Sequence, residues 1–298
     1  MTDKQCGYVA LVGAPNAGKS TLMNRLMGTK VSIVTHKVQT TRARIIGVSV
    51  LDSAQIVFVD TPGIFVPKRR LERAMVAAAW GGAADADVIV LLVDASERSL
   101  DHAQHVVAGL KKAGRQAVLA LNKIDLVPRD TLLGLTEQLN ATGVFTETYM
   151  ISALTGDGAD DLIPRFAAML PKGPWLYPED HLTDMNERLF ASEITREKLF
   201  LRLHQELPYA LTVETEGWQE RSDGSVKIDQ VIYVERTSQR AIVLGKGGQQ
   251  IKTIGAGARA EMEELMERKI HLFLFVKVRD KWRDDPERYR EMGLDFSE

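Results

Sequence analysis

Cysteine and long hydrophobic segments are almost missing from this sequence. Cys6 is the single cysteine among 298 residues, so an intramolecular disulfide is impossible and no extracellular disulfide framework is implied. The most apolar run, residues 88–93, is far shorter than the roughly 20 residues that cross a bilayer. The opening residues, MTDK, do not start the hydrophobic region of a signal peptide. We therefore expect a cytoplasmic protein without a targeting or transmembrane segment.

The sequence also carries little net charge. A formal net charge of −2 gives no argument for nucleic-acid binding by itself. Among the histidines, only His102 and His105 lie close together, and an i, i+3 pair without a third ligand is a weak metal signal. No arrangement of Ser, His and Asp or of Cys and His predicts covalent catalysis. Residues 236–260 are the exception in charge, with five basic residues and no acidic one. Any RNA contact is expected there.

The length predicts more than one domain. A chain of 298 residues is longer than one hydrophobic core usually supports. The 45% hydrophobic and 26% charged contents are ordinary for a globular protein. Residues 171–184 include three prolines, which predicts a stiff connection. We expect a first domain at residues 1–173, a linker at 174–184 and a second domain at 185–298.

A phosphate-binding loop is the strongest motif in the chain. Residues 13–20 read GAPNAGKS and fit GxxxxGK[S/T] at every fixed position. A buried-strand pattern, residues 8–12, precedes the loop, and apolar residues at helical spacing follow at 21–27. In this context, backbone N–H groups and the helix N-terminus converge on phosphates. Lys19 is expected to reach the β/γ oxygens, and the Ser20 hydroxyl is a suitable Mg²⁺ ligand.

The stretch after the first helix is a candidate for a loop that closes over the triphosphate. Residues 30–50 contain no acidic residue. A threonine in such a loop can give its hydroxyl to Mg²⁺ and its N–H to the γ-phosphate. We favour Thr41 over Thr40 for this role. The alternative is a plain basic connection into a strand at residues 45–51.

A second motif supplies a carboxylate. Residues 56–59 read as a buried strand, and the sequence DTPG follows them. This pattern places Asp60 at the tip of a strand, the usual ligand edge of an α/β sheet. We expect Asp60 to hold Mg²⁺ through water. Gly63 has no side chain to obstruct the approach of its N–H to the γ-phosphate.

The next residue, Ile64, cannot orient an attacking water as a glutamine would. Another group must therefore assist hydrolysis. The Asn16 amide oxygen is a candidate ligand for K⁺, which can place positive charge where other nucleotide-hydrolysing proteins use an arginine. In the structural alternative, Asn16 only hydrogen-bonds within its loop.

The sequence NKID at residues 122–125 predicts which nucleobase the site binds. It follows the strand 117–121. The Asp125 carboxylate can accept from both N1–H and the 2-amino group of guanine, whereas adenine offers neither donor there. Ser152, Ala153 and Leu154 follow the predicted strand 148–151, so their backbone can meet the guanine O6. Residues 88–93 read as another buried strand, and the amphipathic stretch 100–113 leads from it to the strand 117–121. These βα repeats predict a doubly wound α/β fold.

The second domain begins with a predicted helix at residues 185–206. Strands at 210–220 and 226–235 are joined by Asp-Gly, a hairpin signal. Residues 245–248 read GKGG and precede an amphipathic helix, and a last strand is expected at 271–278. The sequence does not tell whether residues 241–244 are helical or extended.

The element order and the glycine turn together predict a type II KH module of α+β class. A lone GxxG is a weak signal, but here it lies in the acid-free window and precedes Ile-Lys on a helix. Glycines let a sugar-phosphate strand approach backbone N–H groups closely. Lys246, Arg240 and Lys252 would add positive charge.

Together these motifs resemble the Era family of bacterial ribosome-assembly GTPases, over nearly the whole chain. Further similar segments are residues 30–34, 39–42, 67–71, 176–180 and 193–198. The resemblance implies a GTP-hydrolysing protein that binds the 3′ end of 16S rRNA through its KH domain and acts in assembly of the 30S subunit. It also implies a helix at 241–244, peripheral association with the inner membrane, Mg²⁺ at Ser20 and Thr41, and K⁺ near Asn16. We expect a monomer.

The sequence leaves one alternative open, a signalling or membrane-regulatory GTPase whose KH-like module binds protein. Asp125 disfavours an ATP-driven enzyme. The expected GTP/GDP-binding residues are Gly13, Asn16, Ala17, Gly18, Lys19, Ser20, Thr21, Asp60, Gly63, Asn122, Lys123, Asp125, Ser152, Ala153 and Leu154. Catalysis is expected from Lys19, Asn16, Thr41 and Gly63, Mg²⁺ binding from Ser20, Thr41 and Asp60, and K⁺ binding from Asn16. RNA contacts are expected from Arg240, Gly245, Lys246, Gly247, Gly248 and Lys252.

Overall fold

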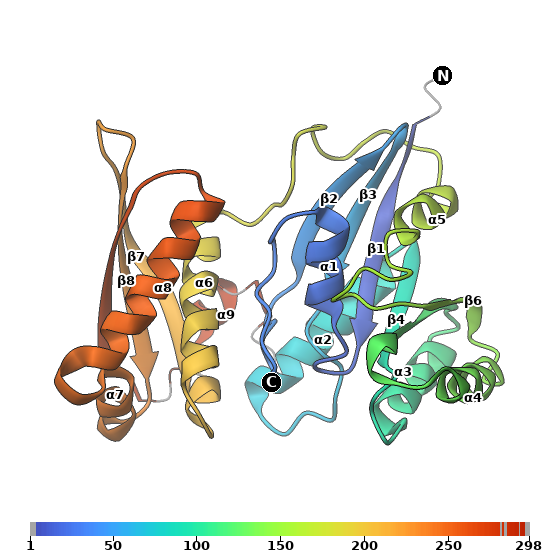
Figure 1. The fold of residues 1–298 in the computed structure, drawn as a ribbon, viewed down its shortest axis with the longest axis horizontal. Coiled ribbons are helices and arrows are strands. Elements are labelled where there is room, and N and C mark those ends of the chain that lie inside the picture. Colours follow the sequence, from blue (N-terminus) through green and yellow to red (C-terminus); the bar gives the residue numbers. More distant parts are fainter. Residues whose placement is uncertain (1–3, 281, 283–284, 292, 296–298) are drawn as a thin grey trace. The chain divides into compact units, whose positions relative to one another are not determined.

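The computed structural model describes residues 4–280, 282, 285–291 and 293–295. Its contacts divide the chain into two units (Figure 1). The first unit comprises Met1–Ser32, Thr41–Asp184 and Arg290–Glu298, and the second comprises Ile33–Thr40 and Met185–Tyr289. The short segment Ile33–Thr40 therefore belongs with the C-terminal unit, although its flanking residues belong to the N-terminal one. The first three residues of the predicted first domain lie outside the described part of the chain.

A mainly parallel sheet forms the centre of the first unit. Its described strands are β1 (Gln5–Gly13), β2 (Ile45–Leu51), β3 (Ala54–Asp60), β4 (Val88–Asp94), β5 (Ala117–Asn122) and β6 (Phe145–Met150). Their order in the sheet is β2-β3-β1-β4-β5-β6, and only the β2–β3 pair is antiparallel. Strands β3 and β4 are buried along their whole length, as expected for a parallel sheet covered on both faces.

The helices of the first unit follow the strands in βα alternation (Figure 1). They are α1 (Lys19–Met27), α2 (Arg70–Asp85), α3 (Asp101–Lys112), α4 (Arg129–Asn140) and α5 (Leu162–Met169), with a 3₁₀ turn at Ile124–Leu126. The core on one side joins Leu91 and Leu119 of the sheet to Val106 and Leu110 of α3. The carboxyl ends of β1 and β3 lead directly into the loops that carry the predicted phosphate and carboxylate motifs. The predicted doubly wound fold is confirmed.

The second unit is a smaller α+β structure. Its elements are α6 (Glu187–Arg202), β7 (Leu211–Glu220), β8 (Val226–Val234), α7 (Thr237–Leu244), α8 (Gln249–Leu265), β9 (Ile270–Val278) and α9 (Pro286–Glu291), with 3₁₀ turns at Leu207–Ala210 and Lys246–Gly248. The sheet order is β7-β8-β9, with β7 and β8 antiparallel and β8 and β9 parallel. Ile194 and Ala258, from α6 and α8, share a core with Ile228 of β8. The KH-type order is confirmed, and residues 241–244 are helical.

Several predicted boundaries shift in the structure. The first helix of the second unit begins at Glu187, because the Asn186 side chain accepts the N–H of Leu189 at 2.8 Å and caps it. This helix ends at Arg202, before the 3₁₀ turn that contains Pro208. Strand β6 begins at Phe145 rather than at residue 148. Helices α2 and α4 were not predicted, since α2 is rich in alanine and α4 buries only two of its residues.

Residues 174–184 belong to the first unit. The Gln55 Oε1 atom accepts the N–H groups of Leu176 and Tyr177 at 2.8 and 3.0 Å. The N–H of Val48 donates to Leu182 O at 2.9 Å. One buried glutamine thus fixes the predicted linker to the β2–β3 hairpin. Among the described residues, no helix is both long and apolar enough to cross a membrane.

Candidate nucleotide site and nucleic-acid interface

The phosphate loop connects the end of β1 to the start of α1, as the sequence predicts. Gly18 precedes the helix in a left-handed conformation, with φ 98°, and no described side chain caps the helix N-terminus. The first N–H groups of α1 therefore have no side-chain acceptor and can bind an anion. Thr21 lies in the first turn of the same helix.

The Lys19 side chain is folded back over its own loop. Its Nζ donates to Gly13 O at 3.2 Å and to Ala14 O at 2.8 Å, and the side chain is buried. Burial lowers the pKa of Lys19 to about 8, and the nearby charge of Asp60 opposes this shift. A phosphate oxygen would supply the counter-charge that the two carbonyls provide only in part.

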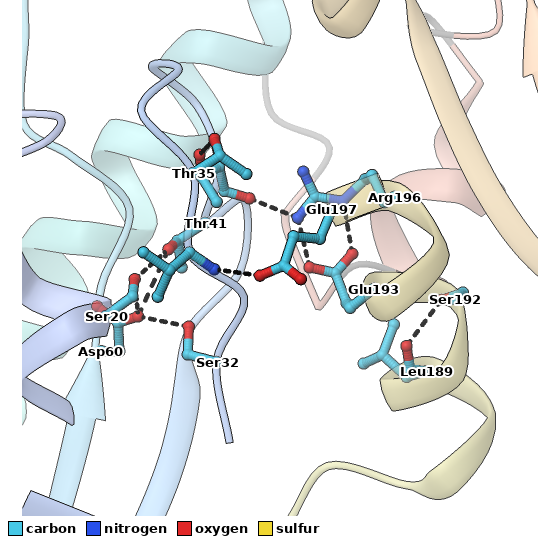
Figure 2. Close-up of polar contacts among 12 residues, drawn as sticks. Ser20, Ser32, Thr35, Thr41, Asp60, Leu189, Ser192, Glu193, Arg196 and Glu197 are labelled. Carbon is cyan, nitrogen blue, oxygen red and sulfur yellow. Dashed lines mark hydrogen bonds and ion pairs between the residues drawn. The ribbon is translucent and has the colours of Figure 1, made fainter. Parts of the chain in front are cut away.

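Three hydroxyl groups gather around the carboxylate of Asp60, at the tip of β3. The Asp60 Oδ2 atom accepts from Ser20 Oγ at 2.6 Å, from Ser32 Oγ at 2.9 Å and from Thr41 Oγ1 at 3.4 Å. The Ser20 and Thr41 hydroxyl oxygens are 2.9 Å apart. Figure 2 shows these four side chains together. Ser20, Thr41 and Asp60 were predicted to meet, whereas Ser32 was not.

The Asp60 carboxylate is fully buried, and its second oxygen has no hydrogen-bond partner within the described residues. Burial raises the pKa of Asp60, while Lys19 and the three hydroxyls oppose the rise. Hydroxyl and carboxylate oxygens are the donors that Mg²⁺ prefers. The cluster therefore fits Mg²⁺. No group of three or more His, Cys, Asp or Glu suited to a metal occurs in the described part of the chain.

Residues after Asp60 pack against the phosphate loop. A Cβ atom at Gly63 would lie 2.7 Å from the backbone N of Pro15, so the close approach requires glycine. The Ile64 N–H donates to Gly13 O at 3.0 Å, and the Ile64 side chain is completely buried in the core. Ile64 therefore serves packing and not water orientation. Asn16 is exposed, with φ 64°.

The base-reading side is fixed to the phosphate loop by Asn122. Its Nδ2 donates to Ala17 O at 2.8 Å, and its Oδ1 accepts the N–H of Ala153 at 2.9 Å. One side chain thus joins the phosphate loop to the loop after β6. Ser152 is buried beside it, and Leu154 is exposed.

Asp125 is exposed in the 3₁₀ turn after β5, where a base can reach it. The preceding Lys123 adopts φ 64° and forms an ion pair with Asp94. Sequence reasoning missed Asp94, although its place directly after the buried run of β4 matches that of Asp60 after β3. The structure thus brings the predicted phosphate, carboxylate and base residues to one edge of the sheet. Their binding roles stay predictions.

In the second unit, the glycine turn lies between α7 and α8. Gly245, Gly247 and Gly248 all have positive φ, at 71°, 60° and 75°. Helix α8 begins at Gln249 with no side-chain cap among the described residues and no acidic residue in its first turn. Lys246 and Lys252 are exposed, while Arg240 Nε donates to Val276 O at 3.1 Å.

A cavity of about 580 Å³ adjoins this turn. Its lining residues are Leu201, Arg202, His204, Gly245, Lys246, Gln249, Gln250 and Thr253. None of these residues is acidic, which suits a polyanion. Sequence reasoning missed Arg202, the last residue of α6, and His204, which follows that helix, because only the fold brings them to the turn.

The fold and these sites define a class, a P-loop nucleotide-binding domain with a KH-type module. A family model described as 50S ribosome-binding GTPase matches residues 8–123, and one described as KH domain matches residues 206–283. GTPase Era of Sinorhizobium medicae is 61% identical over 290 residues, covering 97% of this chain and 94% of the relative. GTPase Era of Brucella suis biovar 1 is 59% identical, covering 99% and 95%. The chain belongs to the Era GTPase family.

Solved structures agree with this assignment. A crystal structure of Era in complex with MgGDPNP and nucleotides 1506–1542 of 16S ribosomal RNA has a TM-score of 0.92 and 38% identity, covering 97% of this chain and 99% of that one. A variant of Aquifex aeolicus Era bound to GDP.AlF4⁻ has a TM-score of 0.91 with the same identity and coverage. The expected family, GTPase activity and guanine-nucleotide binding are confirmed. The protein is a GTP hydrolase with a KH domain.

Proposed function

We propose that this GTPase binds the 3′ end of 16S rRNA through its KH module and acts in assembly of the 30S ribosomal subunit, with RNA binding coupled to the nucleotide state. The proposal rests on one observation above all. The phosphate loop, the Asp60 cluster and an uncapped glycine turn before α8 occur in the same chain. The family relative bound to a 16S fragment and MgGDPNP supports this combination.

In the nucleotide site, the Ser20 and Thr41 hydroxyls would hold Mg²⁺ directly, and Asp60 would hold it through water. When bound, the ion neutralises charge on the phosphate oxygens as it develops during transfer. Lys19 would turn from the loop carbonyls to the β/γ oxygens. The Gly63 N–H would bind the γ-phosphate, and Asn16 would supply one ligand for K⁺. The Lys19 ammonium already contacts the loop, the Ser20 and Thr41 hydroxyls already lie together, and Gly63 already packs closely against Pro15.

On the base side of the nucleotide site, Asp125 would accept from guanine, and the backbone of residues 152–154 would donate to O6. Since Asn122 joins both loops, base and phosphate recognition share one rigid support. We keep residues 1–173 and 185–298 as the proposed functional domains. The cytoplasmic location, the monomeric state and peripheral membrane association stay predictions, the last from the resemblance alone.

The substitution Asp125→Asn tests whether Asp125 recognises guanine. The variant should lose GTP affinity by roughly 100-fold or more and gain affinity for XTP, whose 2-oxo group accepts where guanine donates. Nucleotide affinities of both proteins for GTP and XTP are measured by fluorescence titration. Unchanged GTP affinity without any gain for XTP would remove Asp125 from the base site.

The RNA proposal is tested with the full chain and a single-stranded RNA of the 16S 3′-terminal sequence. A scrambled RNA of the same length and composition is the control. Binding should be stronger for the 16S sequence and should weaken steeply between low and moderate salt. Equal, salt-insensitive binding of both RNAs would favour a module that binds protein instead.

A further inference from the structure

Helix α6 holds the segment Ile33–Thr40, which the contacts place in the same unit. The Val34 N–H donates to Glu197 Oε1 at 2.8 Å. Arg196 donates to the carbonyl oxygen of Thr40. Between these two contacts, Lys37 Nζ donates to Phe200 O at 2.5 Å. One helix therefore binds the segment near its start, in its middle and at its end.

Each contact has a clear physical basis. An ionised carboxylate that accepts a backbone N–H forms a stronger bond than a neutral acceptor. Phe200 O belongs to the last turn of α6, where carbonyls lack intrahelical partners and a lysine ammonium is favourable. Arg196 is itself oriented, because its Nε donates to Glu193 Oε1 at 2.7 Å. Arg196 is thus oriented by a partner on its own helix and not only by the segment.

The residues on either side of the segment belong to the first unit, and both bind one carboxylate. Ser32 Oγ donates to Asp60 Oδ2 at 2.9 Å, and Thr41 Oγ1 does so at 3.4 Å. Thr40, whose carbonyl is held by Arg196, is the chain neighbour of Thr41. The Thr41 hydroxyl lies 2.9 Å from that of Ser20. In this arrangement of the segment, the two expected Mg²⁺ ligands are already together.

We infer that Arg196 and Glu197 are positioning residues for the GTPase reaction. Through residues 33–40 they place Thr41 where a γ-phosphate and Mg²⁺ need it. This inference rests on the proposed roles of Ser20, Thr41 and Asp60. An unanchored segment must lose its conformational freedom when triphosphate binds, whereas α6 has already restricted it. GDP lacks the γ-phosphate, so its affinity does not depend on this anchoring.

The coupling is reciprocal. If the anchored segment strengthens triphosphate binding by some factor, triphosphate must strengthen the contact between the segment and α6 by the same factor. Helix α6 packs on the KH sheet through Ile194 and on α8 through the same core. The helix that supports the glycine turn would therefore respond to the nucleotide through backbone groups of residues 33–40.

The test compares alanine variants within the full chain. Arg196→Ala and Glu197→Ala should bind GDPNP with Mg²⁺ about 5- to 20-fold more weakly than the natural protein, with GDP affinity changed less than about twofold. The matched controls on the same helix are Arg188→Ala and Glu187→Ala, which pair with β7 and with Arg268. The controls should leave both affinities unchanged. Glu197→Gln keeps an acceptor for the Val34 N–H and should recover most of the loss.

A second measurement separates positioning from general damage. Hydrogen exchange at the Val34 amide should slow when GDPNP binds the natural protein, and it should not slow in Glu197→Ala. Equal weakening of GDPNP and GDP, or GDPNP affinity unchanged in both alanine variants, would overturn the inference. A natural protein that binds neither nucleotide would instead overturn the proposed nucleotide site. Thermal unfolding of each variant shows whether it is folded.

Discussion

Two glycine-rich turns lead into helices in this protein, and they need their glycines for different reasons. In the phosphate loop, a Cβ atom at Gly18 would lie 2.1 Å from Asn122 Nδ2. In the turn before α8, a Cβ atom at Gly247 would meet no described atom within 4 Å. Both residues have positive φ, at 98° and 60°. The first turn is closed by the protein's own packing, whereas the second is open on the side where we propose that RNA binds.

This difference indicates which interactions determine the conformation of each turn. Asn122 holds the phosphate loop through Ala17, so this loop is preorganised and needs little rearrangement to bind phosphate. Among the glycines of the second turn, a close contact within the described residues occurs at Gly245, where a Cβ atom would be 2.7 Å from Gln250 Cβ. Substitutions should therefore damage the site itself in the first turn and only ligand binding in the second.

The largest effect is expected from Gly18→Ala. The new methyl group must displace Asn122, which breaks its bonds to both nucleotide loops, and the backbone is strained as well. We expect a loss of about 3–5 kcal/mol of GTP-binding free energy, roughly 150- to 5,000-fold in affinity. Gly28→Ala is the control, because Gly28 also has positive φ, at 66°, but a Cβ atom there meets no described atom within 4 Å.

Nucleotide titration and thermal unfolding measure the two proteins side by side. The control should lose only about 1–2 kcal/mol of stability from its backbone strain. It should keep GTP affinity. If Gly18→Ala binds GTP as well as Gly28→Ala does, the contact with Asn122 does not shape the loop.

Gly247→Asp is expected to have a smaller effect, which lowers RNA affinity and leaves the nucleotide site intact. The side chain and its negative charge enter the space that a phosphate would occupy, which should cost about 2–4 kcal/mol, or roughly 30- to 1,000-fold in RNA affinity. Basal GTP hydrolysis should change less than about twofold. Gly224→Asp is the matched control, since Gly224 lies in the β7–β8 hairpin with φ 79° and open space around it.

RNA affinity is measured by filter binding at moderate salt, with circular dichroism to verify folding. Both aspartates carry the same charge and a similar backbone cost, so only their positions differ. If Gly247→Asp binds RNA as tightly as the natural protein does, or if Gly224→Asp loses as much RNA affinity, RNA does not bind in the open space beside Gly247.

The smallest effect is expected from Asn16→Ala, at the exposed position of the otherwise closed loop. The backbone cradle and Lys19 remain, so nucleotide affinity should stay nearly intact. Stimulation of hydrolysis by K⁺ over Na⁺ should disappear, because one cation ligand is lost. Turnover rates in matched K⁺ and Na⁺ buffers provide the measurement. Equal stimulation in both proteins would place the cation elsewhere.

The parts of the site that could be predicted are those whose residues lie next to a recognisable strand in the sequence. The phosphate loop and the Asp60 motif follow buried strands directly, and the sheet then brings the strand ends together without further information. Asp94 could have been found by the same rule. Ser32 could not, because a lone serine in a loop carries no periodic signal and reaches Asp60 only through the path of the loop.

Long-range contacts account for the other misses. Residues 33–40 read as part of the first domain, yet Arg196 and Glu197, far along the chain, hold them in the second unit. Arg202 and His204 likewise meet the glycine turn only after folding. Helix α4 escaped prediction because only Leu132 and Leu139 are buried, too few to give a clear helical period.

The burial of Cys6 has a practical consequence for measuring these effects. Its side chain is 8% exposed, and its thiol donates to Gln55 Oε1 at 3.5 Å. Burial raises the pKa of Cys6, so little reactive thiolate forms near neutral pH. Maleimide dyes should therefore leave the folded natural chain unlabelled. A cysteine introduced at exposed Lys252 and another at exposed Leu126 would be the only sites of attachment, and distances between the two units could then be followed in solution as the nucleotide changes.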